Sequence, residues 1–368
     1  MSKQRADYLR ERSAGTSAGY TGVAALLPGE VLWRERYTYL EAHGYVLRQR
    51  YRPDWVPSWL NTGFAPYSCE DSIMSLEDQI LDAVRLRDNL TVAIKIVSSA
   101  SEEITIARLL SSAESSRNPN NHCVPIEDVI PDPLNPNKSL LIMPYLRPFD
   151  SPPFEVVEEV MDFIKQTLEG LCFIHSQGIA HRDCTSGNIM MDGRSLFPDG
   201  HHPVYKRATQ DISGEARHFN RVGRSIRYYY IDFGMSSHFK GDESPYVLGA
   251  KGGDQDVPEL SNEYPYNAFM VDIFILGHLY EMEFLQVYLG LSFLEPLVSA
   301  LTHSQPERRP TAESALRMFH DIHQGLNHTH LHWRLRKRSE SGTERVVYDT
   351  ISAAKMGLSL VRRGIMGS

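Results

Sequence analysis

The chain has 368 residues, of which 42% are hydrophobic and 23% are charged, and its formal net charge is −8. This balance excludes a largely disordered chain, and the acidic charge argues against a protein that holds nucleic acid through a generally basic surface. The four cysteines lack CxxC spacing and no window reaches 18 apolar residues, so we expect a cytoplasmic protein without a zinc site, a disulfide scaffold or a membrane span.

The first part of the chain is predicted to contain strands. Residues 1–36 form a mixed N-terminal extension whose small-residue run, SAGTSAG at 13–19, indicates a flexible lead. Residues 80–97 predict two strands, because apolar and β-branched residues flank a turn-forming pair, Asp88 and Asn89. A short helix is expected next, since Ser99 and Glu102 have the spacing of a capping box.

The rest of the chain changes from strands to helices. Strands are expected around 124–129 and at 140–143, where the second ends at Pro144. Periodicity predicts a helix over 155–176, polar aperiodic residues predict a long loop over 194–224, and SIRYYYI predicts an aromatic strand over 225–231. From 260 to about 324 the pattern is helical again. We therefore expect a strand-rich part and a helical part with a ligand cleft between them.

Six short motifs follow one another along these elements. They are Val92-Ala93-Ile94-Lys95, His181-Arg182-Asp183 with Asn188, Asp232-Phe233-Gly234, Pro258-Glu259, Asp272 with Gly277, and Arg309 within ERRPT. Each motif alone is a weak signal, but together and in this order they resemble the eukaryotic protein-kinase family, and in particular a group of fungal kinase-like proteins. The resemblance covers about residues 80–324.

The resemblance implies an α+β fold of the bilobal protein-kinase type, with a small β-rich N-lobe and a larger helical C-lobe. We assign residues 37–146 to the N-lobe and hinge, and residues 147–324 to the C-lobe. The 1–36 extension precedes them, and a basic C-terminal tail, 325–368, follows.

The resemblance also implies ATP and Mg²⁺ as cofactors and a role for each site residue. Asp183 would accept or orient the proton of the substrate hydroxyl, while Asn188 and Asp232 would offer the oxygen ligands that Mg²⁺ prefers. Lys95 would grip the α- and β-phosphates and be held by Glu103. Glu103 is chosen over the preceding glutamate because it shares the apolar face of its helix.

The segment 141–146 is expected to connect the lobes. By similarity, Met143 would be the gatekeeper beside the nucleotide base. The carbonyl of Pro144 would accept a hydrogen bond from the adenine amino group, and the N–H of Leu146 would donate to the ring. An ordinary buried strand that ends at a proline predicts the same residues, so both interpretations stand.

A buried ion pair between Glu259 and Arg309 is expected in the helical part. By similarity the pair is structural and does not touch the nucleotide. Small-molecule kinases with a related core generally lack this segment. The resemblance therefore favours a protein substrate.

Three positions depart from the kinase pattern. The window expected to form a glycine-rich loop, residues 73–78, contains no glycine, and glycines allow the backbone to approach phosphates closely. Thr185 stands where Ser/Thr kinases have lysine, and Gly252 stands where they have threonine. The sequence therefore supports two functions. One is a weakly active protein kinase, with serine or threonine favoured over tyrosine as acceptor, and the other is a nucleotide-binding pseudokinase that acts as a scaffold or allosteric partner.

Two further segments have simpler interpretations. The histidines of the 194–224 loop, His201, His202 and His218, are expected to face solvent. Residues 330–368 hold eight Lys and Arg against three Asp and Glu, so this tail is predicted to contact an acidic partner or the acidic body of its own chain, with a nuclear address as an alternative. We expect no membrane partner and no specific nucleic acid. An amphipathic helix is expected over 346–361.

Overall fold

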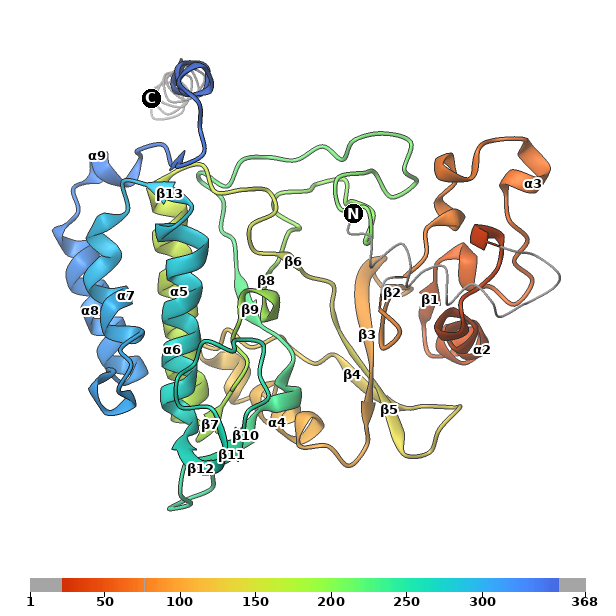
Figure 1. Ribbon diagram of the computed structural model, residues 1–368. Coiled ribbons are helices and arrows are strands. Elements are labelled where there is room, and N and C mark those ends of the chain that lie inside the picture. The colour runs from red at the N-terminus through yellow and green to blue at the C-terminus, as the bar shows by residue number, and fades with distance from the viewer. Residues whose placement is uncertain (1–21, 76, 351–368) are drawn as a thin grey trace.

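The structure is a computed structural model that describes residues 22–75 and 77–350. The fold is α+β, with an antiparallel sheet on one side and a group of helices on the other (Figure 1). The sheet has five strands in the order β1-β2-β3-β5-β4, all of them antiparallel neighbours. Their bounds are β1 Tyr45–Leu47, β2 Ile80–Arg85, β3 Leu90–Ser98, β4 Asp128–Pro131 and β5 Lys138–Pro144.

One face of the sheet is covered by α2 (Pro28–Ala42). Trp33 and Leu40 of this helix form a core with Leu81, Val92 and Ile94 of the central strands. Because side chains alternate along a strand, Ala93 and Lys95 lie on the opposite face. The boundary expected at residue 36 thus falls inside a helix that belongs to the sheet's own core, and the SAGTSAG run at 13–19 lies outside the described residues.

Residues 48–79 connect β1 with β2 and include residues 73–78, where the kinase pattern would place a glycine-rich loop. This connection contains short helical turns and is held by Arg50, whose side chain is fully buried. The Arg50 guanidinium donates to Glu30 of α2 at 2.7 and 2.9 Å and to the Asp71 carbonyl at 3.1 Å. The turns of this connection are η2 Gln49–Tyr51, α3 Trp59–Thr62, η3 Pro66–Ser68 and η4 Glu70–Ser72, while a further turn, η1 Gly22–Ala24, precedes α2.

The short helix after β3 is α4 (Glu102–Leu110). Its N-cap is Ser101, whose side chain donates to the Ser98 carbonyl and makes no capping hydrogen bond. The predicted helix is therefore confirmed, whereas the predicted capping box from Ser99 to Glu102 is wrong. The helix begins at Glu102, so this glutamate occupies its first turn.

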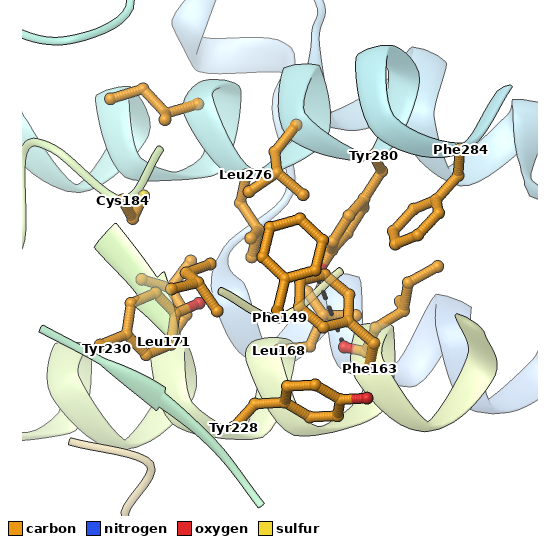
Figure 2. Close-up of a cluster of buried hydrophobic side chains, with 14 of the residues drawn as sticks. Phe149, Phe163, Leu168, Leu171, Cys184, Tyr228, Tyr230, Leu276, Tyr280 and Phe284 are labelled. Carbon is orange, nitrogen blue, oxygen red and sulfur yellow. Dashed lines mark hydrogen bonds between the residues drawn. The ribbon is translucent and has the colours of Figure 1, made fainter. Parts of the chain in front are cut away.

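The helical part is built around α5 (Val157–Ser176) and α6 (Ala268–Tyr280), with α7 (Glu295–Leu301) and α8 (Ala312–Gly325) packed beside them. Figure 2 shows aromatic rings meeting between α5 and α6, among them Phe163 and Phe284, whose centroids lie 5.4 Å apart. The Thr167 and Tyr280 hydroxyls share a hydrogen bond of 2.7 Å in this core. Apart from Asp272 and His278, helix α6 is apolar on all sides, as expected of a helix inside a core.

Short strand pairs surround these helices. They are β6 Arg147–Pro148 with β8 Ile189–Met191 and β9 Tyr228–Tyr230, β7 Ile179–Ala180 with β10 Ser237–His238, β11 Tyr246–Gly249 with β12 Ser261–Asn267, and β13 Tyr288–Leu289 with β14 Arg336–Lys337. The remaining turns are η5 Ser115–Arg117, η6 Ser186–Asn188, η7 Phe233–Met235, η8 Glu281–Leu285, η9 Ser292–Leu294, η10 Pro306–Arg308 and α9 His328–Leu331. The helical pattern expected from residue 260 is corrected at 261–267, which form a strand.

The 192–227 loop connects β8 with β9 and, as predicted, has no helix or strand of its own beyond one isolated bridge. It runs across the top of Figure 1 toward the sheet, where the Tyr145 hydroxyl donates to the Pro203 carbonyl at 2.7 Å. The described part of the C-terminal tail contacts the chain's own body: the Val157 N–H donates to the Trp333 carbonyl at 3.0 Å. Residues 342–350 are helical, and the rest of the helix expected there lies outside the described residues.

Across the described residues, no helix combines the length and the apolar character needed to cross a membrane.

Candidate functional site

The 181–188 loop, between β7 and β8, is fixed by one buried carboxylate. Asp272 of α6 is fully buried and accepts hydrogen bonds from the backbone N–H groups of His181 at 2.8 Å and Arg182 at 2.6 Å. His175, near the end of α5, contacts the same carboxylate at 2.9 Å. These contacts hold Arg182 in the left-handed region, with φ of 66°, which an L-residue rarely adopts. Asp272 of α6 therefore fixes the backbone conformation at the start of this loop.

Asp183 is the carboxylate that this loop presents. Asn188 Nδ2 donates to Asp183 Oδ2 at 2.8 Å and also to the Asp183 carbonyl at 2.8 Å. The other carboxylate oxygen, Oδ1, accepts from the backbone N–H of Gly253 at 2.8 Å. The structure thus brings Asp183 and Asn188 together, as the sequence suggested, and adds Gly253, which the sequence did not single out as a contact.

Lys95, Glu103 and Asp232 form an ion-pair group between the sheet and the helical part. Lys95 Nζ lies 2.5 Å from Glu103 Oε1 on α4 and 2.8 Å from Asp232 Oδ1. Burial alone lowers the pKa of Lys95, but the two carboxylates outweigh burial and hold this pKa above its ordinary value. Burial likewise raises the pKa of Asp232, yet Lys95 outweighs it and the pKa is lowered. Both pKa shifts favour the charged forms of Lys95 and Asp232.

Asp232 owes its position to a turn that directly follows β9 and Ile231. Its φ is 60°, and its Oδ1 accepts from the Gly234 N–H at 3.1 Å. The side chain remains 42% exposed. A carboxylate in this position is fixed at one oxygen and accessible from solvent.

The sheet face that carries Lys95 also carries charged side chains that the sequence analysis did not assign to the site. Ile80 is the register partner of Lys95, and Asp82, two residues further along β2, therefore points to the same face. Arg48 Nε donates to both Asp82 oxygens at 3.0 and 3.2 Å. Burial raises the pKa of Asp82 despite this partner.

The 192–227 loop joins this charged group through His202. His202 is fully buried, and its Nδ1 accepts from the N–H groups of Val204 at 3.1 Å and Tyr205 at 2.9 Å. Nε2 therefore carries the proton and donates to Glu70 at 3.2 Å. Arg48 contacts the same Glu70 carboxylate at 3.2 Å. The solvent-facing position expected for His202 is wrong, because a histidine in an aperiodic loop gives no sequence signal of the partner it meets.

The connector residues differ in their relation to the ion-pair group: Met143 pairs with Ala93 of β3 and so points to the sheet face that carries Lys95. Met143 belongs to β5 and packs with Val97, Ile104 and Leu141. Pro144 and Leu146 line a cavity of about 180 Å³. The residues lining this cavity do not include Lys95, Asp183, Asn188 or Asp232. The cavity is thus separate from the charged residues of the site.

The predicted ion pair of Glu259 and Arg309 is confirmed. The Arg309 guanidinium is fully buried and donates to the two Glu259 oxygens at 2.5 and 2.8 Å. It also donates to the carbonyls of Met270 at 2.8 Å and His303 at 2.7 Å. The pair ties the segment after Asp232 to the start of α8.

Comparison with known proteins gives a likeness over part of the chain. No family model matches the chain. Over 42 residues, 11% of its length, the chain is 52% identical to a light-sensor protein kinase from Ceratodon purpureus. The matched stretch makes up 3% of that protein, so the chain covers only a small fraction of this relative. The likeness hints at a kinase relationship.

Proposed function

We propose that this protein is a protein kinase of the bilobal fold, which transfers the γ-phosphate of ATP to a hydroxyl group of a protein substrate. The observation that carries the proposal is the pairing of Lys95 with Glu103 and Asp232, close to the 181–188 loop with Asp183 and Asn188. Phosphoryl transfer depends mainly on positioning and charge neutralisation, and these five side chains are the types that perform both. The partial likeness to a protein kinase supports the same function.

The donor set fits Mg²⁺. Asp232 has an accessible carboxylate, and Asn188 uses its amide nitrogen toward Asp183, which leaves its amide oxygen free to act as a ligand. Both are hard oxygen donors of the kind Mg²⁺ prefers. When bound, the ion neutralises negative charge on the phosphates. Lys95 supplies a further positive charge for the phosphates on the same face of the sheet.

Asp183 acts on the acceptor hydroxyl. The hydroxyl oxygen attacks the γ-phosphorus, the bond from that phosphorus to the ADP oxygen breaks, and the hydroxyl proton passes to Asp183. A protein substrate is favoured because Glu259 and Arg309 fix the segment that follows Asp232. Among hydroxyl groups, serine or threonine is favoured over tyrosine. Activity is expected to be low, since residues 73–78, where the kinase pattern has its glycine-rich loop, contain no glycine to let the backbone approach phosphates closely.

The charged residues over the site favour a second candidate, a pseudokinase that acts as a scaffold. Asp82 and Arg48 occupy the face of the sheet beside Lys95, and Glu70 and His202 stand next to them. A purine base prefers apolar surfaces, so these charges weaken nucleotide binding unless they rearrange.

The test is transfer of labelled γ-phosphate from Mg-ATP to the protein itself and to generic peptides. Wild type and Asp183→Asn are compared, because the amide is nearly isosteric and cannot accept the proton. A fall of ~10²-fold or more in the variant supports catalysis through Asp183. Wild type that binds ATP without transfer would favour the pseudokinase, and wild type that binds no ATP would exclude both the kinase and a nucleotide-binding pseudokinase.

A further inference from the structure

Gly253 lies in a turn, residues 252–256, that touches the 181–188 loop. Its N–H donates to Asp183 Oδ1 at 2.8 Å. A Cβ placed on Gly253 would lie 2.6 Å from that oxygen and 3.0 Å from Thr185 Cγ2. At the neighbouring Gly252, the nearest atom to a Cβ is the Arg182 carbonyl oxygen, at 3.9 Å, which is an ordinary contact. Residue 253 must therefore be glycine to avoid a clash, whereas residue 252 has room for a side chain.

The 252–256 turn is anchored on the helix that also anchors the 181–188 loop. Asp254 Oδ2 contacts His278 Nδ1 of α6 at 2.7 Å, and the Asp254 side chain is 9% exposed. Within the turn, the Gln255 side chain donates to the Gly252 carbonyl at 2.7 Å. Because Asp272 of α6 holds the other loop, a single rigid helix fixes both partners of the contact between Gly253 and Asp183.

A second connection runs through Arg182. Its guanidinium donates to Ser237 Oγ at 3.2 Å and to the Tyr266 hydroxyl at 3.4 Å. Tyr266 in turn donates to the carbonyl of Gly249, just before the 252–256 turn. The segment that carries Gly253 is thus connected to the 181–188 loop at two neighbouring residues, Arg182 and Asp183.

We propose, on the basis of the proposed function, that the Gly253 amide positions Asp183 for proton transfer. Asn188 holds Oδ2 and Gly253 holds Oδ1, so the carboxylate plane is fixed while each oxygen keeps a lone pair for the substrate. Gly253 is a positioning residue, because it acts on substrate only through Asp183.

The kinetic test compares Gly253→Ala with Gly252→Ala in the full chain, using labelled transfer at varied ATP concentration. Gly253→Ala must push the Asp183 carboxylate aside, so we expect kcat to fall ~10- to 100-fold while the KM for ATP stays within about twofold. Gly252→Ala should change neither value by more than about twofold. Equal kcat values for the two variants would overturn the positioning role, as would a kcat loss accompanied by an equal loss of ATP affinity.

A readout independent of activity keeps the two proposals separate. The midpoint of thermal unfolding is measured for wild type, Gly253→Ala, Asp183→Ala and the double variant, which form a double-mutant cycle. If the contact exists, Gly253→Ala lowers the midpoint less in the Asp183→Ala background than in wild type, since the clashing oxygen is gone. Equal losses in both backgrounds would overturn the contact. A coupled cycle in a chain that transfers no phosphate would overturn the proposed function and with it the catalytic role of Gly253, but not the contact.

Discussion

A single buried side chain, Asp272, determines the shape of the 181–188 loop. It receives two backbone N–H groups and one histidine nitrogen, from His181, Arg182 and His175. The Cys184 thiol also points to the Asp272 carbonyl at 3.4 Å. A fully buried carboxylate is stable only when hydrogen-bond donors surround it. These buried donors in turn depend on the carboxylate as their acceptor.

Asp272→Ala is therefore expected to destabilise the protein by ~3–5 kcal/mol, because it leaves several buried donors without an acceptor. Urea unfolding of wild type and variant measures the loss. Asp321→Ala, at an exposed position on α8, serves as the control and should change the free energy of unfolding by less than ~0.5 kcal/mol. If both variants unfolded at the same urea concentration, the loop would not depend on Asp272.

Helix α5 begins at a buried acid. Glu159, in its first turn, accepts through Oε2 from the N–H groups of Glu155 at 2.6 Å and Val156 at 3.3 Å. Its other oxygen, Oε1, is buried and finds no hydrogen-bond partner within the described chain. Burial raises the pKa of Glu159 to about 7, although the Glu155 N–H and nearby Arg221 favour the ionised form.

This shift predicts a pH dependence of stability. The pKa of folded Glu159 lies above its ordinary value of 4.5, so its contribution to stability is complete below about pH 4.5 and is lost as the pH rises through about 7. Glu159→Gln stays neutral and keeps an acceptor oxygen. The variant should therefore gain ~3 kcal/mol relative to wild type between pH 4.5 and 7.5.

Urea unfolding at several pH values measures this difference. Glu313→Gln is the matched control, because Glu313 lies exposed in the first turn of α8. The control should show no comparable change with pH. A constant difference between Glu159→Gln and wild type across this range would mean that Glu159 is ionised in the folded protein throughout.

Elements with local signals could be predicted, and elements made by distant partners could not. Strands β2 and β3 follow from β-branched residues around the turn at Asn89, whose φ of 58° suits asparagine. Strand β12, SNEYPYN, shows no apolar alternation and exists because β11 pairs with it. In the same way, Lys95 and Asp232 could be predicted because they lie in motifs of known order. Arg48 and His202 could not, because the contact between their distant segments produces no pattern in the sequence.

At the scale of the whole molecule, three contacts within the described residues join the sheet to the helical part. The ion-pair group of Lys95 is one of them. At the second, the Val124 N–H donates to the Tyr230 carbonyl of β9 at 2.9 Å. The third is the 192–227 loop, which reaches the 48–79 connection through His202 and Glu70. The first two contacts lie beside α4 and α5. The third lies at the 48–79 connection, so we expect it to restrain the motion of that part of the chain.

His202→Ala tests this arrangement. The substitution leaves two N–H groups of the loop without their acceptor, at a cost of ~1–3 kcal/mol, and removes one of the two donors to Glu70 Oε1, while Arg48 remains as the other. Hydrogen exchange followed by mass spectrometry should show faster exchange in residues 200–208 and 66–75, and unchanged exchange in α5, because only the His202 contact of the third connection is removed. The control is His218→Ala, at an exposed histidine of the same loop, which should leave residues 66–75 unchanged. Faster exchange confined to 200–208 in His202→Ala would mean that the loop is held by its own turns and does not restrain the sheet.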